Sequence, residues 1–297
     1  MVALGTLRLV RKHTTVTRLL FYPMPARKRF NALPGFGLTM GVTMFFLTVM
    51  VLIPFAALVI RSCEMSWHDF WKLATNARAM AAYRLTFGAS FCAAVANAIF
   101  GTLLAWVLVR YEFPGRRLID AMVDFPFALP TAVAGLTLAN LFAANGWLGK
   151  FLVPIGIKGA YTQLGVGIAL TFVGMPFVVR TLQPVLEHME QEVEEAAATL
   201  GAGRLRTFVS VIAPTLFPPV LTGFALAFAR AIGEYGSVVF ISSNRPFGGE
   251  IAPLLIMIRL DTDFTGAIAL AVVLLVISFV LLALINLLEQ WASHFQN

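Results

Sequence analysis

The pattern of apolar and polar positions divides the chain into long uncharged runs and short charged segments. Three runs, at 36–60, 85–109 and 264–288, contain no charged residue. A helix needs about 20 apolar residues to cross the roughly 30 Å of hydrocarbon in a bilayer. Backbone groups in lipid must be hydrogen-bonded within the segment, so each run predicts a membrane-spanning α-helix. None of the runs alternates in the manner of a barrel strand.

Three further runs are shorter or carry charge. The run at 125–144 follows two aspartates, the run at 164–179 is short, and the run at 220–241 contains Arg230 and Glu234. With these runs included, the sequence predicts an all-α, polytopic membrane protein of about six transmembrane helices.

The runs also divide the chain into parts. A transmembrane domain is expected over 36–290, with a polar loop at 187–214 between the fourth and fifth spans. A basic arm at 1–35 precedes this domain, and a short tail at 291–297 follows it. Composition agrees with a membrane protein, because only 12% of the residues are charged, whereas a soluble domain has about a quarter.

Lysine and arginine predict the orientation, because cytoplasmic flanks carry an excess of them. If the chain begins in the cytoplasm, thirteen lie in inner segments and eight in outer segments, with Arg230 left out as intramembrane. Both termini and the 187–214 loop are then cytoplasmic. The arm at 1–35 has no acidic residue and indicates a positive-inside anchor; the alternative is an organelle transit peptide, with a plastid envelope as the location.

Other classes of protein fit the sequence poorly. The basic residues form short clusters beside apolar spans, which is not typical of a nucleic-acid-binding domain. Cys63, Cys92 and the four histidines show no metal-ligand spacing, and no phosphate-binding loop or Ser/His/Asp set is recognisable. The sequence therefore predicts neither an enzyme nor a cofactor held by this chain.

The polar loop has the composition of a short helix followed by a sharp turn. Glutamates are frequent between 187 and 195 and precede three alanines at 196–198. Glutamate is favourable near a helix N-terminus, and alanine is a strong helix former. Gly201 and Gly203 are expected to end this helix, and a second helix is expected from about Leu205. Such a knob would fit a groove of a partner; the alternative is an ordinary solvated loop.

This loop resembles the cytoplasmic EAA loop of ABC importer permeases, which seats in a cleft of a separate ATPase subunit. The residues that match the family pattern are Glu195, Ala196, Ala197, Gly201, Val211 and Pro214. Ala213 stands where the family usually has leucine. The resemblance covers roughly residues 33–290 and narrows to sulfate/thiosulfate permeases of the CysT type. Four further strings carry it: Tyr111–Arg116, Asp124–Leu136, Pro176–Arg180 and Arg230–Gly236.

Four residues are candidates for the solute pathway or its gate: Arg230, Glu234, Pro130 and Thr131. Arg230 and Glu234 are four residues apart and share one helix face; charges within hydrocarbon should face the bundle interior and be paired. Pro130 removes a backbone donor and kinks its span, and broken helices are where transporters expose backbone groups to solutes. The alternatives are a structural ion pair and a packing kink.

The resemblance implies the permease subunit of an ATP-driven importer in the cytoplasmic (inner) membrane of a bacterium. This subunit would move sulfate or thiosulfate by alternating access. The resemblance also implies the partners: a second homologous permease, a dimer of ABC ATPases that holds ATP and Mg²⁺, and a periplasmic binding protein. ATP would be hydrolysed on the ATPase and not on this chain. Three other functions stay open: a molybdate or tungstate ABC permease, an ion-coupled secondary anion transporter, and a membrane scaffold.

Overall fold

The computed structural model describes residues 36–189, 195–197 and 199–294, and the regular structure in these residues is entirely helical. This confirms the predicted all-α fold. The chain divides into two compact units after Ala56, and the bundle described below belongs to the second unit.

Five helical runs in the described residues are long and apolar enough to cross a membrane. They are Phe36–Cys63, Ala77–Arg110, Gln163–His188, Arg204–Ile232 and Phe264–Leu288. Each of them overlaps a run that the sequence pattern predicts.

The run expected at 125–144 is broken into two shorter helices, α6 (Phe125–Ala128) and α7 (Thr131–Phe142). Leu129 and Pro130 between them are extended, with ψ angles of 136° and 132°. The break follows from Pro130, because a proline ring clashes with the backbone of the residue before it and pushes that residue out of the α region. The 12 residues of α7 rise about 18 Å, which is less than the roughly 30 Å of hydrocarbon.

The run expected at 220–241 also differs from the observed helix. Helix α12 (Ala213–Ile232) ends at Ile232, and α13 (Val238–Ile241) is a separate turn of helix. At its other end, α12 continues without interruption from α11 (Arg204–Thr207), so the second helix, expected from about Leu205, and the fifth span form one continuous helix. The early start follows from the apolar residues between Leu205 and Pro219, which extend the span toward the loop.

Two π-helical turns, η1 (Thr48–Leu52) and η3 (Phe208–Ile212), lie within long helices. Helix α1 (Phe36–Leu47) leads into η1, and α2 (Ile53–Cys63) follows it. Both π-turns are followed two residues later by a proline, Pro54 and Pro214. Proline lacks an N–H and clashes with the carbonyl one turn earlier, and a widened turn relieves the clash while the helix continues. Pro214 therefore begins α12 without ending the membrane helix.

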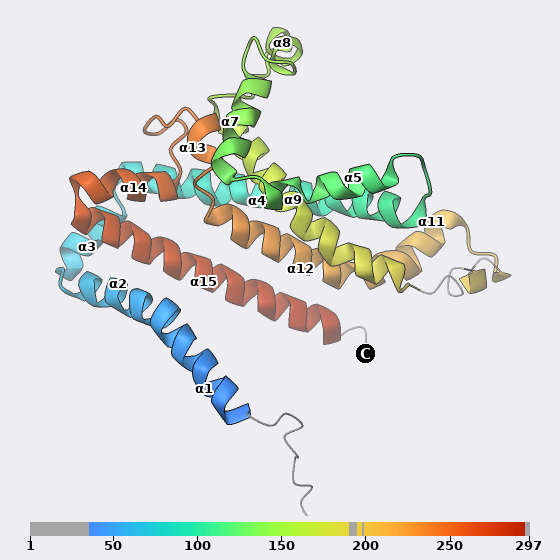
Figure 1. The fold of residues 1–297 in the computed structure, drawn as a ribbon, viewed down its shortest axis with the longest axis horizontal. Helices are drawn as coiled ribbons and strands as arrows, with labels where there is room; N and C mark the ends of the chain where they lie inside the picture. The colour runs from blue at the N-terminus through green and yellow to red at the C-terminus, as the bar shows by residue number, and fades with distance from the viewer. Residues whose placement is uncertain (1–35, 190–194, 198, 295–297) are drawn as a thin grey trace, which may run out of the picture. The chain divides into compact units, whose positions relative to one another are not determined.

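Three helices form the centre of the bundle: α4 (Ala77–Arg110), α9 (Gln163–Glu187) and α12. Each of these three packs against the other two, and α15 (Phe264–His294) lies along α12. Helix α14 (Ala252–Thr262) packs against α15 and α4 (Figure 1). Buried aliphatic side chains such as Leu108, Val178 and Leu216 fill the space between the central helices.

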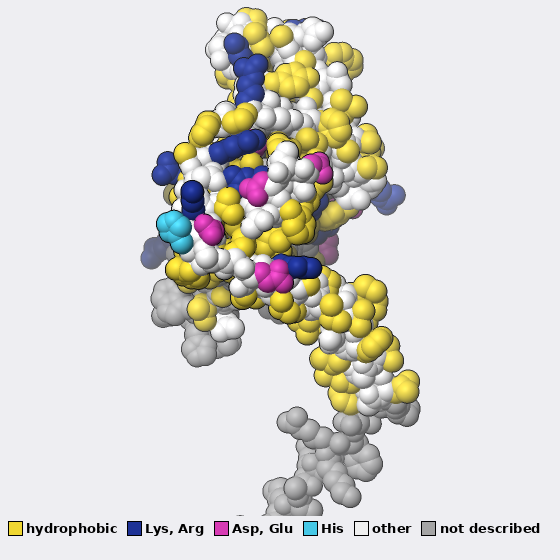
Figure 2. Space-filling view, turned by 90° about the vertical axis from the view of Figure 1, so that its left-hand side faces the viewer, with side chains coloured by type: hydrophobic (Ala, Val, Ile, Leu, Met, Phe, Trp, Pro, Cys, Tyr) yellow, Lys and Arg dark blue, Asp and Glu magenta, His cyan; other side chains and the backbone are white. Residues whose placement is uncertain are grey.

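Shorter helices lie at the two ends and on one flank of this bundle. They are α3 (Trp67–Ala74), α5 (Arg116–Val123), α8 (Gly149–Leu152) and the 3₁₀ turn η2 (Val153–Ile155). Helices α3 and α14 mark one end, and α5 and α11 mark the other (Figure 1). Figure 2 looks onto the α3 end, where charged side chains gather among apolar surface. Charge gathered at this end suits a bundle of apolar helices that crosses a bilayer.

Candidate functional site

The loop between α9 and α12 contains a short helix that ends at a left-handed glycine. Residues 195–197 and Thr199 are helical, and Gly201 has φ +80°. The Ala202 N–H donates to the Ala197 carbonyl over 3.0 Å. This 6→1 bond beside a left-handed residue is the Schellman motif, which satisfies carbonyl groups at a helix C-terminus. Gly201 thus has the helix-ending role that the sequence predicts for it.

Gly203 has a different role from the one expected. It is the N-cap of α11 with φ −69° and ψ 157°, extended backbone that any residue can adopt. Only Gly201 of the two glycines therefore requires a left-handed conformation. The expected glutamates at 190, 192 and 194, and Ala198, lie outside the described residues.

The loop presents apolar side chains around this turn. Leu200 is 87% exposed and Leu205 is 78% exposed, while Glu195 and Ala196 on the preceding helix are also exposed. Large exposed apolar side chains on a rigid turn are typical of a surface that a partner covers. A solvated loop, the alternative reading, gives no reason for this pair of leucines.

An ion-pair cluster that the sequence analysis did not identify as a site lies near the same end of the bundle. Arg180 of α9 donates through Nε to Asp124 Oδ1 over 2.8 Å and also donates to Asp124 Oδ2. Its Nη1 donates to Asp120 Oδ1 over 2.7 Å, and its Nη2 donates to the Asp120 carbonyl over 2.9 Å. Gln183, one turn further along α9, donates to Asp120 Oδ1. We call Asp120, Asp124, Arg180 and Gln183 the Arg180 cluster.

The Arg180 cluster connects the broken segment to the helix that leads into the loop. Asp124 is both the C-cap of α5 and the N-cap of α6, so it lies directly before the Pro130 break. The hydrogen bond from Gln183 and the contacts with Arg180 lower the pKa of the Asp120 carboxyl group. Asp120 is therefore ionised at neutral pH, and a bidentate guanidinium–carboxylate contact holds Asp124 in a defined geometry. The signal in the sequence was a single arginine in an otherwise uncharged stretch of α9 and two aspartates at the end of α5.

Thr131, one of the candidate pathway residues, lies against the turn that follows α12, and Pro130 directly precedes it as the N-cap of α7. A Cβ atom added to Gly236 would overlap the Thr131 hydroxyl group, and one added to Gly135 would overlap the backbone of Ser237. The first turns of α7 therefore touch the backbone at 236–237 directly. This contact brings Thr131, one of the four expected site positions, to the turn that carries Glu234.

Arg230 and Glu234 form an ion pair with each other. Arg230 is in the last turn of α12, whereas Glu234 follows the helix end. The Glu234 side chain is 2% exposed and the Arg230 side chain is 36% exposed. Glu234 also accepts hydrogen bonds from the N–H and the hydroxyl group of Ser237, each over 2.9 Å. Glu234 thus braces the turn that contacts α7, and Arg230 has a partly exposed face; contact with a solute stays a prediction.

We expect Gly135→Ala to destabilise the protein, because the added methyl group would overlap the backbone of Ser237. Overpacking of this kind costs about 1–3 kcal/mol. Thermal denaturation of the purified chain in detergent measures the effect. Gly88→Ala in α4 is the matched control, since nothing lies within 4 Å of its added Cβ and alanine is the better helix former. Equal denaturation temperatures for the two variants would contradict the close approach of α7 to the turn.

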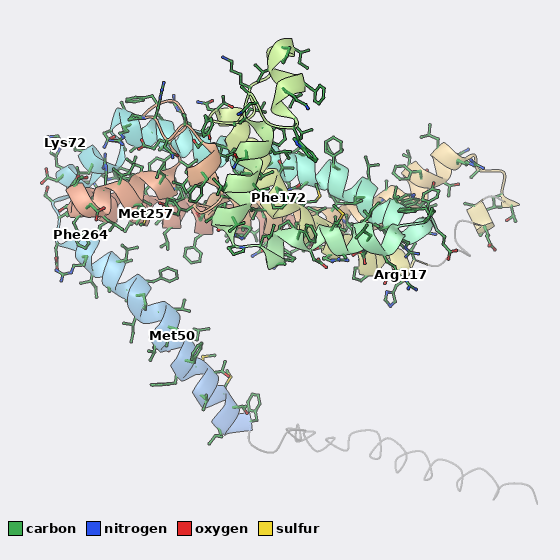
Figure 3. The ribbon with its side chains drawn as sticks, turned by 45° about the horizontal axis from the view of Figure 1, so that its top comes forward. Met50, Lys72, Arg117, Phe172, Met257 and Phe264 are labelled. Carbon is green, nitrogen blue, oxygen red and sulfur yellow. The ribbon has the colours of Figure 1, made fainter. Side chains whose placement is uncertain are left out.

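The Arg180 cluster and the loop lie toward one end of the bundle. Figure 3 shows Arg117 of α5 at this end, Phe172 of α9 near the middle, and Lys72 and Phe264 at the opposite end. In the described part of the chain, no group of three or more His, Cys, Asp or Glu side chains is arranged to hold a metal ion.

The long apolar helices are those of a membrane protein, and the comparison with protein families identifies its family. Residues 97–294 match the family described as binding-protein-dependent transport system inner membrane component. The match covers more than half of the chain, and the chain therefore belongs to this family.

Curated relatives are similar over most of their length. The sulfate transport system permease protein CysT of Synechocystis sp. is 48% identical over 276 residues, which cover 93% of this chain and 96% of that protein. The protein of the same name from Escherichia coli (strain K12) is 48% identical and covers 88% and 94%. The probable sulfate transport system permease protein cysT of Nephroselmis olivacea is 52% identical and covers 84% and 88%.

Solved structures agree on the fold. A chain of a bacterial ABC transporter involved in the import of the acidic polysaccharide alginate has a TM-score of 0.70 at 13% identity, covering 85% of this chain and 93% of that chain. A chain of the MetNI methionine ABC transporter in an inward-facing conformation has a TM-score of 0.55 at 17% identity, covering 77% and 99%. The fold is thus that of ABC importer permeases.

Proposed function

We propose that this chain is the membrane-spanning permease subunit of an ATP-driven importer for sulfate or thiosulfate in a bacterial cytoplasmic membrane. The observation that carries the proposal is the exposed helix and left-handed glycine turn at Glu195–Gly201. The family and the names of its relatives support the substrate class.

The proposal assigns ATP hydrolysis to a separate ABC ATPase dimer, which binds ATP and Mg²⁺ and seats the loop. A second homologous permease completes the pathway, and a periplasmic protein delivers the anion. One solved relative is an alginate transporter in complex with a pentasaccharide-bound periplasmic protein, which supports a partner of this kind. The excess of basic residues on one side supports cytoplasmic termini and a cytoplasmic loop.

The geometry suggests how force reaches the pathway. The loop follows directly from α9, and α9 carries Arg180, which binds the two aspartates beside the Pro130 break. A displacement of the loop by the ATPase would move α9, and the Arg180 cluster would transfer that movement to the segment before α7. Alternating access then needs only two arrangements of these elements, one favoured by ATP.

Growth of a deletion strain tests the substrate. A strain that lacks this gene should fail to grow with sulfate as the sulfur source and should grow with cysteine; the intact gene should restore growth on sulfate. If the strain grows normally on sulfate but loses a molybdenum-dependent activity, the molybdate permease is the correct assignment.

We expect Arg230→Ala to lower both stability and uptake. It leaves the buried Glu234 carboxylate without its cation, at a cost of about 1–3 kcal/mol. The double variant Arg230→Gln with Glu234→Gln removes both charges and should recover much of the stability but not the uptake, if the guanidinium group meets the anion. Denaturation temperature and radiolabelled sulfate uptake separate the two effects. An Arg230→Ala chain that assembles and transports normally would remove the pathway role.

A further inference from the structure

We infer that the groove between α3, α4 and α15 binds an anionic phospholipid, with an acyl chain in the groove and the phosphate group at Arg84. This inference rests only on the location of the chain in a membrane and is independent of the transported solute. The groove encloses about 720 Å³, within the roughly 300–1,000 Å³ of typical small-ligand pockets. We call it the α3 groove.

Apolar and aromatic side chains make most of the α3 groove. Trp67 and Trp71 come from α3, Met80 and Phe87 from α4, and Val273 and Ile277 from α15. Such a lining matches a hydrocarbon chain and offers few partners to water. All three helices belong to the same compact unit, and α3 packs against both α15 and α4.

The depth of Arg84 matches that of a lipid phosphate. Helix α4 has 34 residues, which rise about 51 Å, more than the roughly 40–45 Å of a whole bilayer. Arg84 lies seven residues after Ala77, the first residue of α4, or about 10 Å along the helix. With about 30 Å of hydrocarbon centred on α4, this position is the boundary between the headgroups and the acyl chains. The groove continues from this boundary toward the middle of the membrane along α4 and α15.

The aromatic side chains of α3 support the same position in the membrane, at the boundary between the headgroups and the acyl chains. The Trp67 ring contacts both Phe70, at 6.2 Å between centroids, and Trp71, at 5.6 Å. Trp67 is nevertheless 75% exposed. Tryptophan is enriched at membrane–water interfaces, where one part of the ring meets hydrocarbon and the N–H meets water or headgroups. Lys72 of the same helix lies at this end of the bundle (Figure 3) and adds a second cation near the headgroups.

Arg84 is a cation without an anionic partner among the described residues. The neighbouring Arg78 is bound by the Glu250 carboxylate through two hydrogen bonds of 2.8 and 2.6 Å, whereas no ion pair joins Arg84 to another described residue. Arg84 is exposed, and the aliphatic part of its side chain lines the α3 groove, whose lining is almost wholly apolar. A guanidinium group binds a phosphate through two parallel hydrogen bonds, so an anionic headgroup above an acyl chain supplies the missing partner. A helix of another subunit would fill the groove but would need an acidic residue at this depth.

Quenching of tryptophan fluorescence tests the site in the assembled transporter. The complex is reconstituted in vesicles that contain increasing fractions of phosphatidylglycerol or phosphatidylcholine with brominated acyl chains. The fluorescence of the two groove tryptophans is obtained by subtraction: the fluorescence of a complex with Trp67→Phe and Trp71→Phe is subtracted from that of the unmodified complex. We expect brominated phosphatidylglycerol to quench this fluorescence at about a tenfold lower lipid fraction than brominated phosphatidylcholine. A tenfold preference is what one charge-assisted hydrogen-bonded interaction can supply.

Two variants locate the interaction. Arg84→Gln should remove the preference for phosphatidylglycerol and leave quenching by phosphatidylcholine unchanged, whereas Arg61→Gln, which breaks an exposed pair with Glu64, should retain the preference. Val276→Phe, placed in the groove, should weaken quenching by both lipids. Equal quenching by the two lipids in the unmodified complex, or a preference that survives Arg84→Gln, would overturn the proposal. Absence of quenching by either lipid would show that a protein segment covers the groove and would also overturn it.

Discussion

Gly201→Val is expected to abolish co-purification of this chain with its ATPase while leaving membrane insertion intact. Gly201 has φ +80°, and the helix of the loop ends there through the bond from Ala202 to Ala197. A β-branched residue cannot adopt this conformation without strain, and the left-handed region costs an ordinary residue about 1–2 kcal/mol. The turn would open, and the exposed Leu200 and Leu205 would lose their relative positions. We expect the affinity for the ATPase to fall at least about tenfold.

Two matched variants separate the backbone effect from simple crowding. Gly201→Asn should bind nearly normally, because asparagine tolerates the left-handed region. Gly203→Ser should also bind normally, since Gly203 is an N-cap with φ −69° and serine is a preferred N-cap residue. Nothing lies within 4 Å of a Cβ added to either glycine, so steric overlap within the chain does not distinguish them. Unchanged binding of Gly201→Val would count against the loop as the docking element.

Arg180→Ala is expected to give the second large effect, on both stability and transport. It removes every guanidinium contact with Asp120 and Asp124 and leaves the two carboxylates without their cation. These side chains are 43% and 48% exposed. The free energy of unfolding should therefore fall by about 1–3 kcal/mol, between the effect of breaking a surface ion pair and that of breaking a buried one. The broken segment before α7 would also lose its link to α9, and sulfate uptake should fall more than stability does.

Two control variants separate the charge of Arg180 from the geometry of its guanidinium group and from the loss of any ion pair. Arg180→Lys keeps the charge but lacks the planar fork, so an intermediate effect is expected. Arg61→Ala breaks an exposed pair with Glu64 and should change the denaturation temperature little. Denaturation of the purified chain and ATP-dependent uptake by vesicles are the two measurements. If Arg180→Ala matches Arg61→Ala in both, the Arg180 cluster does not connect the loop to the pathway.

Local features of the fold follow from the sequence. The left-handed turn at Gly201 could be predicted because a helix former, a glycine and a second apolar segment are neighbours in the chain. The pairing of Arg230 with Glu234 could also be expected, because a spacing of four residues places two charges one helical turn apart. Both features depend on contacts within a few residues.

Long-range features could not be placed in this way. Arg180 binds residues 56 and 60 positions away, a contact that exists only once α5 has packed beside α9. The pattern also gave one uniform run at 125–144, because apolar residues continue through Pro130. Hydrophobicity does not register the extended backbone that a proline imposes on the residue before it. The fifth apolar run was predicted to begin only at 220, because Arg204 and Arg206 lower the hydrophobicity of the first turn of this helix.

The central claim is that movement of this bundle depends on ATP hydrolysis by another subunit that holds the Glu195–Gly201 loop. The most direct measurement is uptake of radiolabelled sulfate by vesicles that contain the two permeases, with the binding protein inside or outside and the ATPase present or omitted. The account predicts vectorial uptake only when ATPase and ATP are both present, with no effect of collapsing the proton gradient. Uptake by the permeases alone, driven by an ion gradient, would contradict it.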